Sequence, residues 1–98
     1  MQGALTQEDF AKCVNQACQV HHGPKNVEMQ LIECRKLHNP GARAGHREPF
    51  ALLFRGPKTP ILEQRMYLFD FQHLGPVEIF IVPIGPDELG MRYEAVFA

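Results

Sequence analysis

The alternation of apolar and polar positions is the main structural signal in this chain, and it predicts a mainly β protein. Short runs rich in Val, Ile, Phe and Tyr lie between Gly-Pro dipeptides, which recur four times along the chain. Such runs are typical of strands, and Gly-Pro pairs are typical of the turns between them. The predicted strands cover about residues 17–22, 27–37, 50–55, 66–72, 77–83 and 91–97, with one long loop at 38–49.

The second predicted strand changes phase along its length. Val27, Met29 and Leu31 occupy alternate positions, but the apolar positions that follow are Ile32 and Cys34. A slip of one residue turns every later side chain to the other face of a sheet. We therefore predict a β-bulge near Leu31 and Ile32, which would also bend this strand.

The start of the chain has helical spacing instead. Thr6 is a suitable N-cap, and Glu8 and Asp9 suit the positive end of a helix dipole. Apolar residues from Phe10 onward then recur at helical intervals. We predict one short helix at about residues 7–14.

These elements predict a single domain over residues 1–98. Short turns favour antiparallel neighbours, so the simplest architecture is a six-stranded antiparallel meander that curls into a small barrel or roll. The helix is expected to plug one end. The strand at 77–83 is apolar on both faces, which predicts that it is central or covered by the helix. The strand at 91–97 is either an open edge that could pair with a second copy, or an edge that the helix covers.

Composition and charge narrow the class of protein. Hydrophobic residues make up 45% and charged residues 21% of the chain, and the net charge is −1. These values are ordinary for a soluble globular domain and favour neither nucleic acid nor a membrane as a partner. The chain has no signal-peptide pattern and no apolar run of about 18–20 residues. We therefore expect a cytoplasmic protein, either a monomer or a weak homodimer.

The residue types that carry chemistry form no recognisable catalytic set. Cys13 and Cys18 precede His21 and His22, but a zinc site needs about four converging ligands, and the second close pair is missing. Adjacent histidines on a strand point to opposite faces. The sequence contains no serine, and its cysteines show no local enzyme signature. We expect no catalytic activity, no metal and no cofactor.

Two groups of charged residues are the candidate functional residues. Arg43, His46 and Arg47 make the 38–49 loop basic, and loops on a rigid scaffold often bind partners. The alternative is a linker whose charges only keep it soluble. Arg92 and Glu94 stand close together on the last strand and could form an ion pair that fixes strand register, or belong to a binding surface.

Three stretches of the chain each resemble a sequence motif of one protein family. They are EPFALLFRGP at residues 48–57, EIFIVPIGP at 78–86 and GMRYEAVF at 90–97. Together they resemble an uncharacterised family of bacterial proteins of about 100 residues that is described as a domain of unknown function. The resemblance implies a gene neighbourhood with phage-tail or collar-like genes, and it brings no catalytic or binding residues with it.

The sequence therefore predicts a non-enzymatic structural or protein-interaction module, an accessory of a phage-tail-like assembly that binds a protein partner. The alternative function is a small-ligand-binding β-barrel with the 38–49 loop at its mouth. The supply of Phe and Ile favours a filled interior over an open cavity, as in most small barrels.

Overall fold

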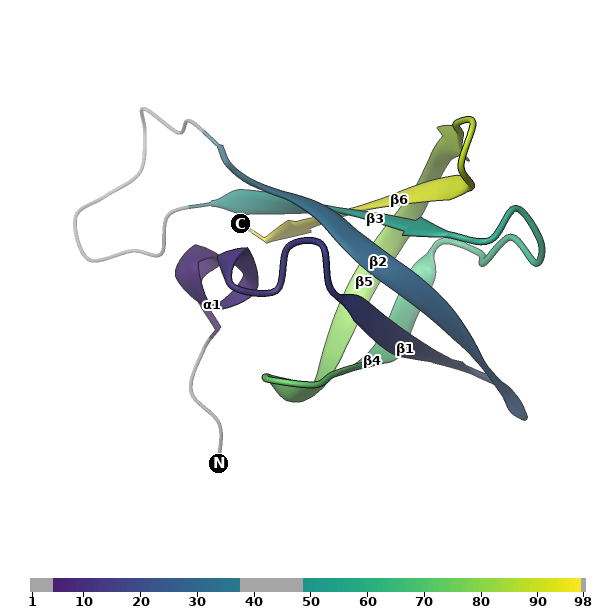
Figure 1. Ribbon diagram of the computed structural model, residues 1–98, viewed down its shortest axis with the longest axis horizontal. Helices are drawn as coiled ribbons and strands as arrows, with labels where there is room; N and C mark the ends of the chain where they lie inside the picture. The colour runs from purple at the N-terminus through teal and green to yellow at the C-terminus, as the bar shows by residue number, and fades with distance from the viewer. Residues whose placement is uncertain (1–4, 38–48, 98) are drawn as a thin grey trace.

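The computed structural model describes residues 5–37 and 49–97 and has six strands and one helix in these ranges (Figure 1). The elements are α1 (Gln7–Ala11), β1 (Ala17–His22), β2 (Lys25–Lys36), β3 (Phe50–Gly56), β4 (Arg65–Phe71), β5 (Gly75–Pro86) and β6 (Met91–Phe97). The predicted mainly β fold is confirmed. No helix in the described ranges is long and apolar enough to cross a membrane.

The strands close into a barrel in the order β1-β2-β3-β6-β5-β4, and every neighbouring pair is antiparallel. The prediction of a single meander is wrong in its connectivity. Two three-stranded meanders, β1-β2-β3 and β4-β5-β6, are joined by residues 57–64. This connection carries the chain across one end of the barrel, so β4 pairs with β1 and β3 pairs with β6. Because the connection is longer than a hairpin turn, β4 is free to pair with a strand other than β3.

The last strand is not an edge of the sheet. β6 pairs along its whole length with β3, from Phe50–Phe97 to Gly56–Met91, and its first half also pairs with β5. Neither of the two predicted states of this strand, an open edge or an edge under the helix, is therefore correct. Closure of the barrel uses the backbone groups of Met91–Glu94 on the β5 side that edge-to-edge dimerisation through β6 would need.

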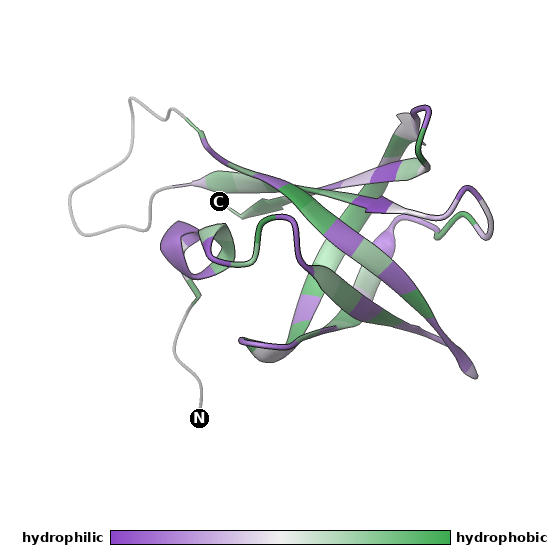
Figure 2. Cartoon of the chain, viewed as in Figure 1, coloured by the Kyte–Doolittle hydropathy of each residue, from purple (hydrophilic) through white to green (hydrophobic). Residues whose placement is uncertain are grey.

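Strand periodicity sorts the side chains between the barrel interior and the solvent. Hydrophobic and hydrophilic residues alternate along β2 in Figure 2, and its buried positions are Val27, Met29 and Leu31. Pairing of β2 with β3 then shifts register between Leu31 and Glu33, which confirms the predicted bulge. The extra residue bends β2, so its first half pairs with β1 and its second half with β3.

The helix begins where the sequence predicted but ends earlier, at Ala11 instead of near residue 14. Thr6 and Asp9 form a capping box, in which each side chain accepts a hydrogen bond from the other's backbone N–H. The chain leaves the helix through a turn that ends at Asn15, whose positive φ of 74° is incompatible with further helix. The apolar spacing of this stretch continues into the turn, so the spacing overestimates the helix.

One end of the barrel is closed by α1, as predicted. Phe10 has no exposed surface, and its ring centroid lies 5.8 Å from that of Phe50, 5.8 Å from that of Phe71 and 5.4 Å from that of Phe97. Figure 1 shows α1 beside the end of β6 and the start of β3. A helix of five residues has little stability of its own, so this aromatic contact holds it in place.

The opposite end is closed by the connection between β3 and β4. Leu62 from this connection has no exposed surface. Its backbone N–H donates a hydrogen bond of 2.9 Å to the hydroxyl of the buried Tyr93 on β6. The Tyr67 hydroxyl donates a second bond of 2.9 Å to the carbonyl oxygen of Glu63. An apolar side chain and two hydroxyl contacts therefore fix the connection over this end.

β5 is longer than predicted, because it includes the Gly-Pro pairs that were expected to bound it. Residues 75–81 pair with β4 and residues 82–86 pair with β6, so the strand changes neighbour along its length. The helix does not cover its outer face. Phe80, at the middle of that face, keeps 46% of its surface exposed.

Candidate functional site

The structure places the predicted site residues in two different situations. Arg43, His46 and Arg47 lie outside the described residues. Arg92 and Glu94 lie on the outer face of β6, two positions apart. Glu94 Oε2 is 3.5 Å from Arg35 Nη2 on β2, and Arg92 Nε donates a hydrogen bond of 3.4 Å to the carbonyl oxygen of Gly85 on β5. The contacts of these two side chains thus tie β6 to the strands around it.

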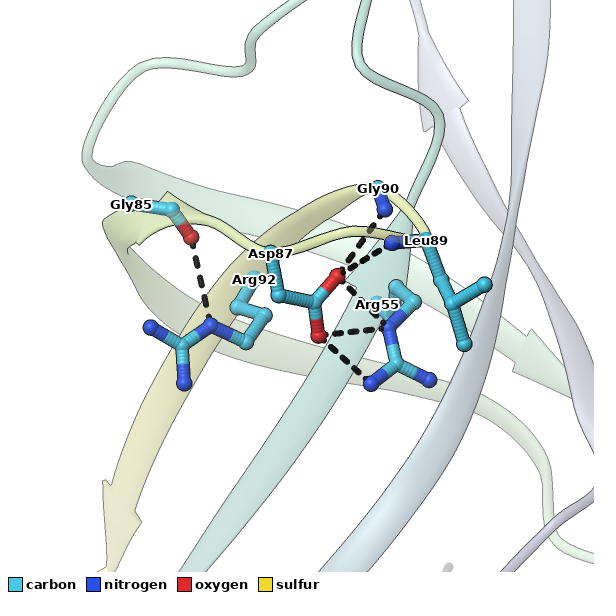
Figure 3. A network of polar contacts seen from close by, with 6 residues as sticks. All are labelled: Arg55, Gly85, Asp87, Leu89, Gly90 and Arg92. Atoms are coloured by element: carbon cyan, nitrogen blue, oxygen red, sulfur yellow. Dashed lines mark hydrogen bonds and ion pairs between the residues drawn. The ribbon is translucent and has the colours of Figure 1, made fainter.

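A second charged pair, which we call the Arg55–Asp87 clasp, lies next to Arg92 (Figure 3). Arg55 Nε is 3.2 and 3.0 Å from the two carboxylate oxygens of Asp87, and Arg55 Nη2 is 2.6 Å from Oδ2. Both side chains are about one quarter exposed. This two-point contact joins the end of β3 to the turn between β5 and β6.

The Asp87 carboxylate also organises the turn itself. Its Oδ1 atom accepts hydrogen bonds from the backbone N–H groups of Leu89 and Gly90, at 2.9 and 3.0 Å. The hydrogen bond from Arg55, together with these two backbone donors, lowers the pKa of Asp87 to about 2. The carboxylate is therefore ionised at neutral pH, with acceptor positions filled by the arginine and the turn.

Gly90 allows the turn to approach β3 closely. A Cβ atom at this position would overlap the carbonyl oxygen of Gly56. Gly56 itself pairs with Met91 at the end of the β3–β6 ladder. Close backbone contact and the Arg55–Asp87 clasp therefore hold the same corner of the barrel.

A polar pocket of about 250 Å³ lies in the outer wall, which we call the Arg92 pocket. Its lining residues are Glu33, Arg35, Ala51, Leu52, Leu53, Ile84, Arg92 and Glu94. Arg35 contacts both glutamates of the lining, at 3.3 and 3.5 Å. The pocket therefore combines charged side chains from β2 and β6 with apolar residues from β3 and β5.

The three cysteines do not form a reactive centre. Cys13 and Cys18 are buried, and Cys34 is partly buried with its Sγ 3.5 Å from the carbonyl oxygen of Gln7. Burial raises the pKa of all three thiols, and that of Cys18 to about 12. A neutral thiol is a poor nucleophile and a poor metal ligand. Among residues 5–37 and 49–97, no group of three His, Cys, Asp or Glu side chains is placed to hold a metal ion.

Sequence reasoning had singled out Arg92 and Glu94 but missed Asp87 as a member of the site. Arg55 and Asp87 are 32 positions apart in the chain, so no local pattern joins them. One signal was available, because an Asp that follows Gly-Pro and precedes a Gly by three positions is typical of a turn stabilised by the Asp side chain.

The fold and these contacts define a class of protein: a small, closed antiparallel β-barrel. Phe10 and Leu62 fill its two ends, and ion pairs on its outer face join neighbouring parts of the wall. The chain belongs to the family described as Domain of unknown function (DUF6916), whose model matches residues 5–97. Searches of curated proteins and of solved structures find no match to this chain. Arg55, Gly90 and Arg92 all fall within the stretches on which the family resemblance rests.

Proposed function

We propose that this protein is a non-enzymatic interaction module whose outer wall binds another protein. Support comes from the way the barrel is filled. The side chains of Phe10 and Leu62 close its two ends, and both are fully buried. Between them lie fully buried rings such as those of Phe54, Phe69 and Tyr93. A filled interior favours this function over a small-ligand-binding barrel and leaves the outside of the wall for recognition.

The observation that carries the proposal is a group of exposed apolar side chains on β4 and β5, which we call the β4–β5 patch. Met66 and Phe80 are direct partners across the two strands and are 54% and 46% exposed. Leu68 follows Met66 on the same face and is 37% exposed. Outward positions of a solvated sheet are normally polar, and neighbouring exposed apolar residues are typical of protein interfaces.

The partner that we propose is a component of a phage-tail-like assembly. This part of the proposal is supported by the gene neighbourhood that the family resemblance implies. A small barrel with a filled interior is suited to a place in such an assembly, because its contacts there depend on shape and surface chemistry.

Native mass spectrometry of the protein mixed with the products of its neighbouring genes tests the proposal. We expect the 11.1 kDa chain to enter a defined complex with one of them. The variant Phe80→Asp should lose the complex, because it places a charge within the β4–β5 patch. Ile61→Asp is the matched control, since Ile61 is 57% exposed on the connection at the barrel end.

Two results would contradict the proposal. One is a bare monomer in every mixture. The other is a monomer that carries a co-purified metal or small molecule, which would direct attention to a ligand-binding function. Equal loss of the complex in both variants would show that the β4–β5 patch is not the binding surface.

A further inference from the structure

The β4–β5 patch has two carboxylates beside it on the same outer face. Asp70 follows Leu68 by two positions on β4, and Glu78 lies directly opposite Leu68 on β5. Both acidic residues are exposed. They occupy diagonal positions of the antiparallel pair, for which the usual separation is about 7–8 Å. One end of the apolar patch therefore carries two like charges that lie near each other.

Within residues 5–37 and 49–97, no cation is paired with these two carboxylates. Neither Asp70 nor Glu78 takes part in an ion pair there. The one basic residue of β4 and β5 is Arg65. It lies on the opposite face from Met66, with its guanidinium carbon 4.9 Å from the centre of the Tyr67 ring. Two carboxylates and no cation give the outer positions of β4 and β5 a formal charge of −2.

The neighbouring strands leave this balance unchanged. On β1 the outer positions beside β4 are Gln19, which pairs with Asp70, and His21. They add no formal charge at pH 7 when histidine is counted as neutral. On the other side, the outer positions of β6 hold Arg92 and Glu94, one charge of each sign. The wall around the β4–β5 patch is therefore acidic on balance.

This charge distinguishes between the possible occupants of the β4–β5 patch. A second copy of the chain in a two-fold contact would bring the same patch, with Asp70 and Glu78 again and no outward cation from β4 or β5. Like charges brought together at an interface repel each other, and an anionic surface would meet the same repulsion. A basic partner instead combines charge attraction with burial of the apolar side chains.

From this arrangement we infer that the β4–β5 patch binds a surface of a partner protein on which a Lys or Arg stands beside an apolar side chain. The apolar side chain packs on Met66 and Phe80, and the cation pairs with Glu78 and Asp70. Glu78 and Phe80 are two positions apart on one face of β5, which corresponds to about 6.6 Å along a strand. Residues two positions apart on an extended partner segment match this spacing. The inference rests on the proposed function and names the chemistry of the partner.

Solution NMR with two peptide probes tests the site without any partner protein. The probes are acetyl-Lys-Thr-Leu-Thr-Leu-amide and acetyl-Glu-Thr-Leu-Thr-Leu-amide, which when extended place the charge and both leucines on one face. We expect the Lys peptide to shift the methyl signals of Met66 and Leu68 and the ring signals of Phe80. At low ionic strength it should bind at least about threefold more tightly than the Glu peptide. Added salt should reduce this difference, because exposed charges are screened.

Variants separate the two carboxylates from the overall charge of the protein. Asp70→Asn combined with Glu78→Gln should remove the preference for the Lys peptide. Glu63→Gln combined with Glu88→Gln is the matched control, because it removes two exposed negative charges that lie outside β4 and β5. This control should keep the preference. Phe80→Ala should weaken binding of both peptides, since it removes apolar contact and leaves the carboxylates in place.

Four results would overturn the inference. They are equal binding of the two peptides, equal effects of the two double variants, no shift of the patch signals by the Lys peptide in the millimolar range, and a homodimer in native mass spectrometry that Phe80→Asp abolishes. Should the Asp70→Asn and Glu78→Gln variant fail to fold, the unmodified protein still decides between the two peptides. A complex with a neighbouring gene product that this variant binds as tightly as the unmodified protein refutes only the basic partner surface and leaves the proposed function standing.

Discussion

The aromatic plug provides the most direct test of how this small barrel is stabilised. We predict that Phe10→Ala destabilises the protein severely. Phe10 is fully buried and lies within 5.8 Å, centroid to centroid, of three other phenylalanine rings. Removal of a buried Phe side chain typically lowers the free energy of unfolding by about 3–5 kcal/mol, through lost burial and the cavity that remains. That is a large part of the roughly 5–15 kcal/mol that stabilises most domains.

The loss is expected to be large because Phe10 is the residue of α1 that is buried in the core. A five-residue helix does not persist without tertiary contacts, so loss of the ring also releases the capping box formed by Thr6 and Asp9. For a domain of this size, each kcal/mol corresponds to about 4–8 °C in Tm. We therefore expect Tm to fall by roughly 12–40 °C.

Urea denaturation followed by far-UV circular dichroism measures this effect. Phe80→Ala is the matched control, because it also removes a phenylalanine side chain, but from the outer wall, where Phe80 is 46% exposed. The control should cost less than about 1.5 kcal/mol, since much of its ring is already in water. If Phe10→Ala lowered the free energy of unfolding no more than Phe80→Ala does, the barrel would be stable without α1. The reasoning that Phe10 stabilises the barrel by closing its end would then be wrong.

Three further predictions concern the barrel corner and the thiols. The low pKa of Asp87, about 2 against an ordinary 3.8, means that its carboxylate stabilises the fold fully above pH 3.8 and loses this contribution as the pH falls through about 2. The gap in urea midpoint between the unmodified protein and Asp87→Asn should therefore be constant near neutral pH and close below pH 3.8; an unchanged gap at pH 2 would contradict this. Gly90→Ala should lower the free energy of unfolding by about 1–3 kcal/mol, because its Cβ overlaps the Gly56 carbonyl; a urea midpoint equal to that of Glu88→Ala, an exposed neighbour in the same turn, would argue against the close contact. Finally, Cys18 should resist thiol-specific reagents at neutral pH in the folded protein and react once urea unfolds it; rapid modification of Cys18 in the folded state, mapped by mass spectrometry, would refute its burial.

Several local features of this protein could be predicted because local physics produces them. A strand with one side in the core shows its alternation directly in the sequence, which located all six strands. The bulge in β2 was visible as a phase change, because an extra residue inverts every later position. Thr6 predicted the start of the helix, since the free N–H groups of the first turn need a side-chain acceptor.

The candidate site was predicted only in part. Arg92 and Glu94 were singled out because they stand close together on the last strand, but Arg92 Nε donates to the Gly85 carbonyl and forms no ion pair within residues 5–37 and 49–97. The contacts that form are between Arg55 and Asp87, and between Arg35 and Glu94, which are 32 and 59 positions apart. Such pairs depend on which strands become neighbours, and that information is not contained in any short segment.

By itself, the sequence determined the elements: six strands, one capped helix and a bulge. Only the tertiary structure decided the order of strands around the barrel, the closure that places β6 between β3 and β5, and the pairing of Arg55 with Asp87. The physical reason is the range of the interactions. Periodicity, caps and turns act over a few residues, whereas pairing of β1 with β4 and of β3 with β6 depends on how the whole chain buries its apolar faces at once.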